Sequence, residues 1–109
     1  MDISTRTSND ISIVAIAGSL DSMSSPQAQK GLEGVLAGAK KVALDFSKLD
    51  YISSAGLRVL LGVAKHLRAS NGKLGIFGLN QSVREVFEIS GFSAILPVYP
   101  SEAEALGAM

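Results

Sequence analysis

Cysteine and tryptophan are absent from this 109-residue sequence, and histidine occurs once, as His66. The lack of cysteine excludes disulfides and thiolate chemistry, and a single imidazole argues against a nitrogen-rich metal site. His66 stands between Lys65 and Leu67 with no nucleophile or base in register, so we interpret it as a histidine on a helix surface. The glycine-rich motifs that cradle phosphates are missing too. We therefore expect no enzymatic activity and no metal or other cofactor.

An excess of either charge is missing as well. Lysines and arginines number 10, and aspartates and glutamates number 10, so no basic surplus attracts nucleic acid or an anionic membrane. No apolar run approaches the roughly 20 residues that span a bilayer, and the opening MDISTRTSND has no apolar signal-peptide core. We expect a cytoplasmic protein that contacts neither nucleic acid nor membrane directly and is a monomer when free.

The residues that are present suit one small packed domain covering residues 1–109, since 47% are hydrophobic and 18% are charged. Alternating and short apolar runs predict strands at 2–7, 11–17, 42–44, 73–78 and 95–98. Start and stop signals predict helices after Ser25-Pro26, from about Ser54 to Asn71-Gly72, from a Ser82–Glu85 capping box to Gly91, and after Pro100. This order predicts an α/β fold with a mixed four- to five-stranded sheet and about four helices mostly on one face.

The most informative stretch is VALDFSKLDYISSAGLRVLL, residues 42–61, in which an apolar strand leads through a polar turn into an amphipathic helix. Open α/β sheets commonly place their sites in such a loop, at the carboxyl end of a strand. Ser53 and Ser54 fall at the helix N-terminus. Their hydroxyls can cap backbone N–H groups, and a phosphate there would meet the same donors and the positive end of the helix dipole. Without further information, plain capping serines are the commoner reading.

The spacing within this stretch closely resembles the signature of the STAS domain family, in particular of bacterial anti-sigma factor antagonists. That signature reads Asp-x-Ser/Thr, a short gap, an apolar residue, Asp/Ser, Ser/Thr, Ser/Thr/Ala, Gly and Leu. The matching residues are Asp45, Ser47, Ile52, Ser53, Ser54, Ala55, Gly56 and Leu57. GSLD at 18–21, FGLNQSVREVFEISGF at 77–92 and ILPVYPSEAEAL at 95–106 also look like this family. The resemblance covers nearly the whole chain and implies a STAS-like single domain.

The resemblance implies phosphorylation at Ser54, because in the family the modified serine or threonine lies two residues before the motif glycine, here Gly56. Ser53 is the alternative. It departs from the aspartate that many family members carry at that position, so either hydroxyl could be the one that is modified.

Three polar loop residues acquire roles from the same resemblance. Asp45 would help to shape the phosphorylation loop, and Asp21, in GSLD, would contribute to the contact with a kinase. Ser47 would stabilise the turn and not react. Read without the family, Asp45 could simply bond nearby loop N–H groups, and Asp21 would be a loop residue or an acidic residue at the entry of a helix.

Several residues around Ser54 are candidates for contact with a partner. Met23, Leu49 and Tyr51 are apolar residues in predicted loops, which a partner could cover or which could close the end of the core. Arg58 belongs to a charged stripe with Lys65 and Arg68 that is either a solvated face or a contact for an acidic surface. The complete predicted partner-binding set is Asp21, Met23, Asp45, Ser47, Leu49, Tyr51, Ser53, Gly56 and Arg58.

The function implied by the resemblance is a partner switch. The unphosphorylated chain would bind an anti-sigma factor of the serine-kinase type and free the sigma factor, phosphorylation of Ser54 would end that binding, and a PP2C-type phosphatase would reset it. One alternative is a scaffold or regulatory subunit with the same fold and no phosphorylation, in a signalling or secretion-control assembly. A third reading, a small nucleotide-binding domain, has no phosphate loop in the sequence to support it.

Overall fold

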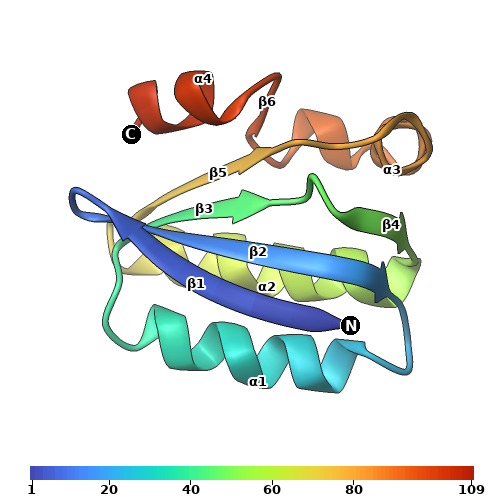
Figure 1. Ribbon diagram of the computed structural model, residues 1–109, viewed down its shortest axis with the longest axis horizontal. Helices are drawn as coiled ribbons and strands as arrows, with labels where there is room; N and C mark the ends of the chain where they lie inside the picture. Colours follow the sequence, from blue (N-terminus) through green and yellow to red (C-terminus); the bar gives the residue numbers. More distant parts are fainter.

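A mixed six-stranded sheet forms the centre of the protein, which we describe for residues 1–109 in a computed structural model. Its strands are β1 (Asp2–Ser8), β2 (Ile11–Leu20), β3 (Lys41–Asp45), β4 (Leu49–Ile52), β5 (Lys73–Phe77) and β6 (Val98–Tyr99). Neighbouring strands follow the order β1-β2-β3-β5-β6, and β4 pairs with β2 (Figure 1). Only β1 and β2 run antiparallel to each other, whereas every other pair is parallel. The sheet is thus the predicted hairpin extended by parallel strands.

Four α-helices and one short 3-10 helix cover this sheet. They are α1 (Ser25–Leu36), α2 (Ser54–Ala69), α3 (Gln81–Ile89), η1 (Phe92–Ala94) and α4 (Glu102–Gly107). The first three α-helices contribute to the larger hydrophobic cluster on one face, and α4 contributes Ala105 to a smaller cluster on the other (Figure 1). This arrangement confirms the predicted α/β fold with helices mostly on one face.

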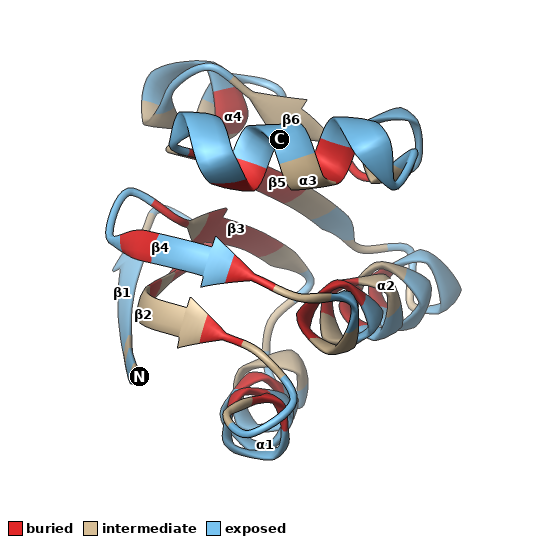
Figure 2. Ribbon diagram, turned by 90° about the vertical axis from the view of Figure 1, so that its right-hand side faces the viewer, coloured by how far each residue is buried: buried red, intermediate tan, exposed pale blue.

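Strand β2 is apolar on both sides because both faces of the sheet are covered. Val14 and Ile16 belong to the larger cluster, whereas Ile11 and Ile13 belong to the smaller one. Figure 2 shows that α1 and α2 turn their buried residues toward the strands. Fully burying one aliphatic side chain of this size contributes about 1.5–3 kcal/mol. Packing of this kind offsets the weak helix propensity of the glycines in α1.

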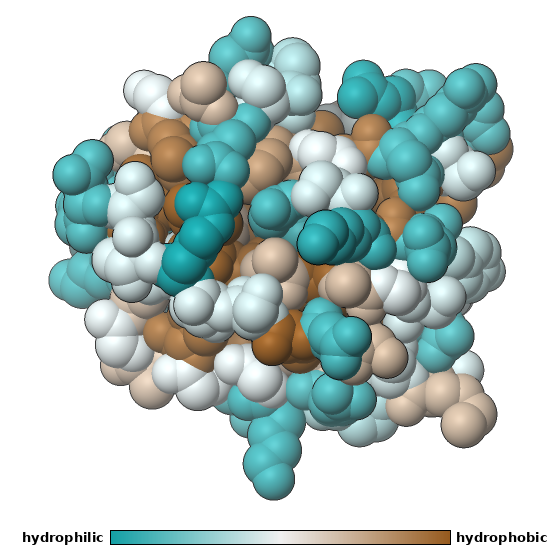
Figure 3. All heavy atoms as spheres, in the orientation of Figure 1, coloured by the Kyte–Doolittle hydropathy of each residue, from teal (hydrophilic) through white to brown (hydrophobic).

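The face that carries α4 is covered less completely. In Figure 3 its apolar residues gather between α4 and the β1–β2 hairpin, and hydrophilic side chains cross them. An ion pair between Arg6 of β1 and Glu102 of α4 spans this region and joins the first strand to the last helix. The hydrogen bonds that Arg6 donates to the carboxylate of Glu102 raise the pKa of Arg6.

The last strand begins three residues later than the predicted strand at 95–98. The chain first turns through η1, after which the N–H groups of Ile95 and Leu96 both donate to the carbonyl of Phe92, at 3.0 Å and 2.8 Å. Pro97 has no N–H to donate, so ladder pairing with β5 is limited to Val98 and Tyr99. The last strand is therefore two residues long.

Two predicted helix starts also differ from the structure. The Ser82–Glu85 capping box does not form, because Asn80 caps α3 with a side-chain oxygen that accepts from the N–H of Val83. The N-cap of α1 is Ser24 in place of Ser25. In contrast, α2 ends as predicted, with Asn71 at a left-handed φ of 59°.

Candidate functional site

One end of the sheet collects most of the predicted site residues. Strands β2, β3 and β5 are parallel, so their carboxyl ends lie at one edge of the sheet. Figure 2 looks onto this end and shows β2 leading into α1 and β4 leading into α2. The sequence pattern does not predict β4, because Asp50 interrupts its apolar residues and because its pairing with β2 contains a register shift between Gly18 and Ser19.

The two candidate serines differ sharply in accessibility. Ser54 is the first residue of α2 and is exposed. Ser53 precedes it, and its hydroxyl oxygen is buried without a hydrogen-bond partner. Of the two serines, Ser54 is therefore the one that another protein could reach in this conformation.

The prediction that these hydroxyls cap the helix is wrong for Ser53. Its backbone is extended, as an N-cap requires, and its carbonyl accepts from Leu57 at 3.0 Å, but its side chain accepts no hydrogen bond. Its N–H donates to the carbonyl of Leu20 at 2.9 Å, which ties the start of α2 to the end of β2. Backbone bonds thus fix the start of α2.

Asp21 organises the turn between β2 and α1. Its carboxylate accepts from the backbone N–H groups of Met23 at 3.0 Å and Ser24 at 3.1 Å. The hydroxyl of Ser24 lies 2.7 Å from the carbonyl of Ser19, to which it donates, and accepts from the N–H of Asp21. These donors, the N–H of Ser24 foremost, hold the pKa of Asp21 below the usual value of 3.8. The carboxylate is therefore committed to its own loop.

We expect this loop to make stability sensitive to acid. Because the pKa of Asp21 is lowered in the fold, the unfolded chain binds the proton first as the pH falls. The stabilisation is therefore complete well above pH 3.8, and it is lost as the pH falls below that value through the folded-state pKa. In urea melts between pH 7 and pH 2, Asp21→Asn should flatten this acid limb, whereas Asp50→Asn, which changes an exposed carboxylate of β4, should leave it unchanged. An equal effect of both variants would contradict this role.

The loop between β3 and β4 is held by a second aspartate. Asp45 accepts from the N–H of Ser47 at 2.9 Å, the self-bonding that a loop carboxylate commonly adopts. Gly78 approaches from the end of β5 with φ +81°, and a Cβ there would lie 2.9 Å from the N of Ser47. Asp45 and Ser47 thus stabilise the loop, and Gly78, which follows β5, leaves room for its backbone.

Asn80 joins the start of α3 to β4, and sequence reasoning missed this residue. Its side-chain oxygen accepts from Val83 at 2.8 Å, and its side-chain nitrogen donates to the carbonyl of Leu49 at 2.9 Å. One residue therefore caps α3 and anchors the start of β4. The available signal is the motif LNQSV, in which an asparagine stands three residues before an inward-facing valine.

Alanine substitutions should separate the two N-cap residues. Asn80→Ala removes two hydrogen bonds and should lower the free energy of unfolding by about 1–2 kcal/mol. Ser53→Ala removes a hydroxyl that has no hydrogen-bond partner, so it should change the free energy of unfolding by less than about 0.5 kcal/mol. A serine N-cap usually contributes about 1 kcal/mol. Chemical denaturation of both variants measures the difference. A Ser53→Ala cost as large as that of Asn80→Ala would show that Ser53 forms a bond in solution.

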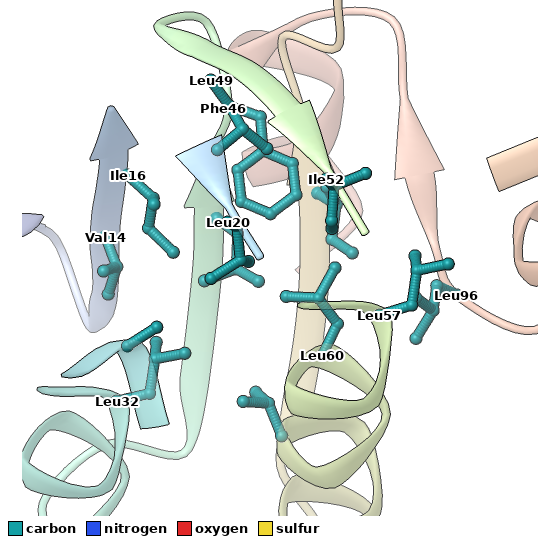
Figure 4. Close-up of a cluster of buried hydrophobic side chains, with 14 of the residues drawn as sticks. Val14, Ile16, Leu20, Leu32, Phe46, Leu49, Ile52, Leu57, Leu60 and Leu96 are labelled. Atoms are coloured by element: carbon teal, nitrogen blue, oxygen red, sulfur yellow. The ribbon is translucent and has the colours of Figure 1, made fainter. Parts of the chain in front are cut away.

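Of the three apolar residues predicted in loops, two are exposed and one is buried. Met23 is 89% exposed in the turn before α1, and Tyr51 is 50% exposed on β4. Leu49 is only 1% exposed, because it begins β4 and packs beside Phe46 in the core, as Figure 4 shows. The prediction that Leu49 lies in a loop and contacts a partner is therefore wrong, and its role is to close the end of the core.

Gly56 is also buried, and its place in the partner-binding set requires correction. A Cβ at this position would lie 2.7 Å from the carbonyl oxygen of Leu20 and 2.8 Å from the side chain of Ile52. The first turn of α2 can approach β2 and β4 this closely only without a side chain. The motif glycine is therefore a packing requirement that sets where Ser54 stands.

A groove of about 520 Å³ runs between α1 and α2 beside this end. Arg58 and His66 line it from α2, and Gln29 and Glu33 line it from α1. His66 is exposed, as predicted for a helix surface. No group of three or more histidine, cysteine, aspartate or glutamate side chains is arranged to hold a metal ion. None of the helices combines the length and the hydrophobicity needed to cross a membrane.

Comparison with known proteins agrees with the motif. The family model described as the STAS domain matches residues 2–105. BtrV of Bordetella bronchiseptica, which is named as an anti-sigma factor antagonist, is 47% identical over 97 residues, covering 88% of this chain and 84% of that protein.

Solved structures share the fold at lower sequence identity. A Thermotoga maritima protein named as an anti-sigma factor antagonist superimposes with a TM-score of 0.91 at 20% identity, over 97% of this chain and 92% of that one. The Bacillus cell fate determinant SpoIIAA, solved in its phosphorylated form, gives a TM-score of 0.72 at 19% identity, over 98% of both chains.

Proposed function

The chain belongs to the STAS domain family, and from this premise we propose that it is an anti-sigma factor antagonist switched by phosphorylation of Ser54. In the unphosphorylated form it binds an anti-sigma factor of the serine-kinase type, and the sigma factor is released. The kinase transfers the γ-phosphoryl group of ATP to the Ser54 hydroxyl, which loses its proton, ADP leaves, and the complex separates. A PP2C-type phosphatase hydrolyses the phosphate ester and restores binding.

The observation that carries this proposal is the exposure of Ser54 next to the buried hydroxyl of Ser53. Ser54 is the first residue of α2, and the motif glycine Gly56 allows that turn to pack closely against β2. Met23 and Tyr51 add exposed apolar surface on neighbouring elements. An accessible hydroxyl beside apolar side chains is a suitable centre for a protein interface.

The position of Ser54 also suits a switch that leaves the domain folded. A phosphate adds about −1.5 to −2 charges, and at a helix N-terminus such charge is locally favourable. Phosphorylation should therefore act at the interface and not through unfolding. One like-charge contact at about 4 Å costs around 4 kcal/mol at an effective dielectric constant near 20.

The proposal is tested by incubating the purified chain with ATP and a serine-kinase-type anti-sigma factor from the same organism, followed by phosphopeptide mapping. We expect one phosphate, on Ser54, in the wild type and in Ser53→Ala, and none in Ser54→Ala. Ser54→Ala should still bind the kinase and should stay bound when ATP is added. Modification of Ser53 alone would refute the assignment, and binding without any modification would favour the scaffold reading.

A further inference from the structure

Arg58 carries a charge that no acidic side chain of the protein neutralises. The two ion pairs of the chain join Arg6 to Glu102 and Lys41 to Asp10, and Arg58 takes part in neither. Glu33 lines the same groove from α1, but its carboxylate accepts a hydrogen bond from Gln29 at 3.4 Å. Arg58 is therefore free to pair with an anion that the folded chain does not itself contain.

The sequence places that anion within reach. Ser54 and Arg58 are four residues apart on α2, and both are exposed. Side chains at this spacing are neighbours on a helix surface, with Cβ atoms about 5–6 Å apart. Helical side chains also lean toward the N-terminus, which directs Arg58 to the turn that carries Ser54. An acidic group four residues before a basic one is the favourable order on a helix.

The other cations of α2 cannot substitute for Arg58. Lys65 and Arg68 lie 11 and 14 positions after Ser54 in the sequence. At 1.5 Å per residue these separations are about 16 Å and 21 Å along the helix axis, beyond the length of either side chain. The charged stripe of α2 therefore contains one residue that can meet a group on Ser54 and two that serve as internal controls.

We propose that the guanidinium of Arg58 forms an ion pair with the phosphate on Ser54, along the surface of α2. This inference rests on the phosphorylation proposed above. Guanidinium groups bind phosphate oxygens through two parallel hydrogen bonds, and the pair would form without any change in the backbone. Phosphorylation then changes the docking surface in two ways. It adds a negative group, and it engages the positive charge of Arg58, which can then no longer pair with a partner. Arg58 is a positioning residue for the phosphorylated state.

The test uses phosphoserine inserted at position 54 during translation, so that no kinase is needed. The phosphate is titrated by phosphorus NMR in the wild-type background, in Arg58→Gln and in Lys65→Gln. The second ionisation of phosphoserine lies near about pH 6. Loss of the ion pair should move its midpoint up by about 0.3 pH unit in Arg58→Gln, with less than about 0.1 unit of change in Lys65→Gln. Arg58→Lys should keep most of the wild-type value.

Other charges at this end are the same in every variant. Asp21 in the turn before α1, Asp50 on β4 and the dipole of α2 are altered in none of the variants, so the difference reports Arg58 alone. Equal midpoints in Arg58→Gln and Lys65→Gln would overturn the proposal. That outcome differs from a failure of the proposed function, in which the kinase would not modify Ser54 whatever the titration shows.

Discussion

Replacing Ser54 by aspartate should weaken binding to the anti-sigma factor more than a hundredfold while leaving the domain folded. The loss corresponds to about 3 kcal/mol, less than the cost of about 4 kcal/mol for one like-charge contact at about 4 Å. The same substitution places a carboxylate at the first position of α2, where the helix dipole favours it by about 0.3–1 kcal/mol. Calorimetric titration with the anti-sigma factor and a thermal melt of the free variant measure both effects.

The matched control is Ser54→Asn, which has the size of aspartate without its charge. We expect it to bind within about tenfold of the wild type, because a neutral side chain of this size introduces no like-charge contact. A similar loss in both variants would mean that Ser54 acts through its shape, and the electrostatic switch would be wrong. Undiminished binding of Ser54→Asp would instead remove Ser54 from the interface.

The second large effect is expected at Gly56. Alanine there brings a methyl group 2.7 Å from the carbonyl oxygen of Leu20, where backbone has to move, so we expect Gly56→Ala to destabilise the domain by about 2–3 kcal/mol. For a domain of this size that loss lowers the melting temperature by roughly 10 °C or more. The displaced first turn would also carry Ser54 with it, so phosphorylation by the kinase should slow as well.

Gly62→Ala makes the same substitution on the same helix, and we expect it to change the stability in the opposite direction. Gly62 is exposed, and a Cβ added there meets nothing within 4 Å. Gly62→Ala should therefore stabilise the protein by about 0.5–1 kcal/mol through helix propensity alone. Thermal and urea unfolding of the pair decide the point. If Gly56→Ala proved as stable as Gly62→Ala, the close approach of α2 to β2 would not exist in solution.

Local patterns predicted the parts of the fold in which neighbouring residues determine the conformation. Alternation predicted the hairpin of β1 and β2. The Asn71-Gly72 signal predicted the end of α2, because the local residue types favour the left-handed conformation that ends a helix. The bounds predicted for the last strand, 95–98, are wrong for the opposite reason. Of the apolar residues in this run, Leu96 is buried, Ile95 is 55% exposed and Val98 pairs with β5, a difference that periodicity over four residues does not reveal.

The candidate site shows the same division. The motif located Ser54, but the burial of the Ser53 hydroxyl and of Leu49 depends on β4 pairing with β2, a contact between residues some 30 positions apart. The hydrogen bond from Asn80 to the carbonyl of Leu49 is equally long-range. Such contacts carry no local periodic signal, so a loop interpretation was the natural error for this segment.

The half-exposed phenol ring of Tyr51 offers a built-in optical reporter. The chain has no tryptophan and only two tyrosines, and the second, Tyr99, packs against the small cluster under α4. Intrinsic fluorescence excited near the tyrosine band thus comes from one ring beside Ser54 and one ring remote from it. A Tyr99→Phe background would leave a single emitter, so that assembly and release could be followed in real time without attaching a dye.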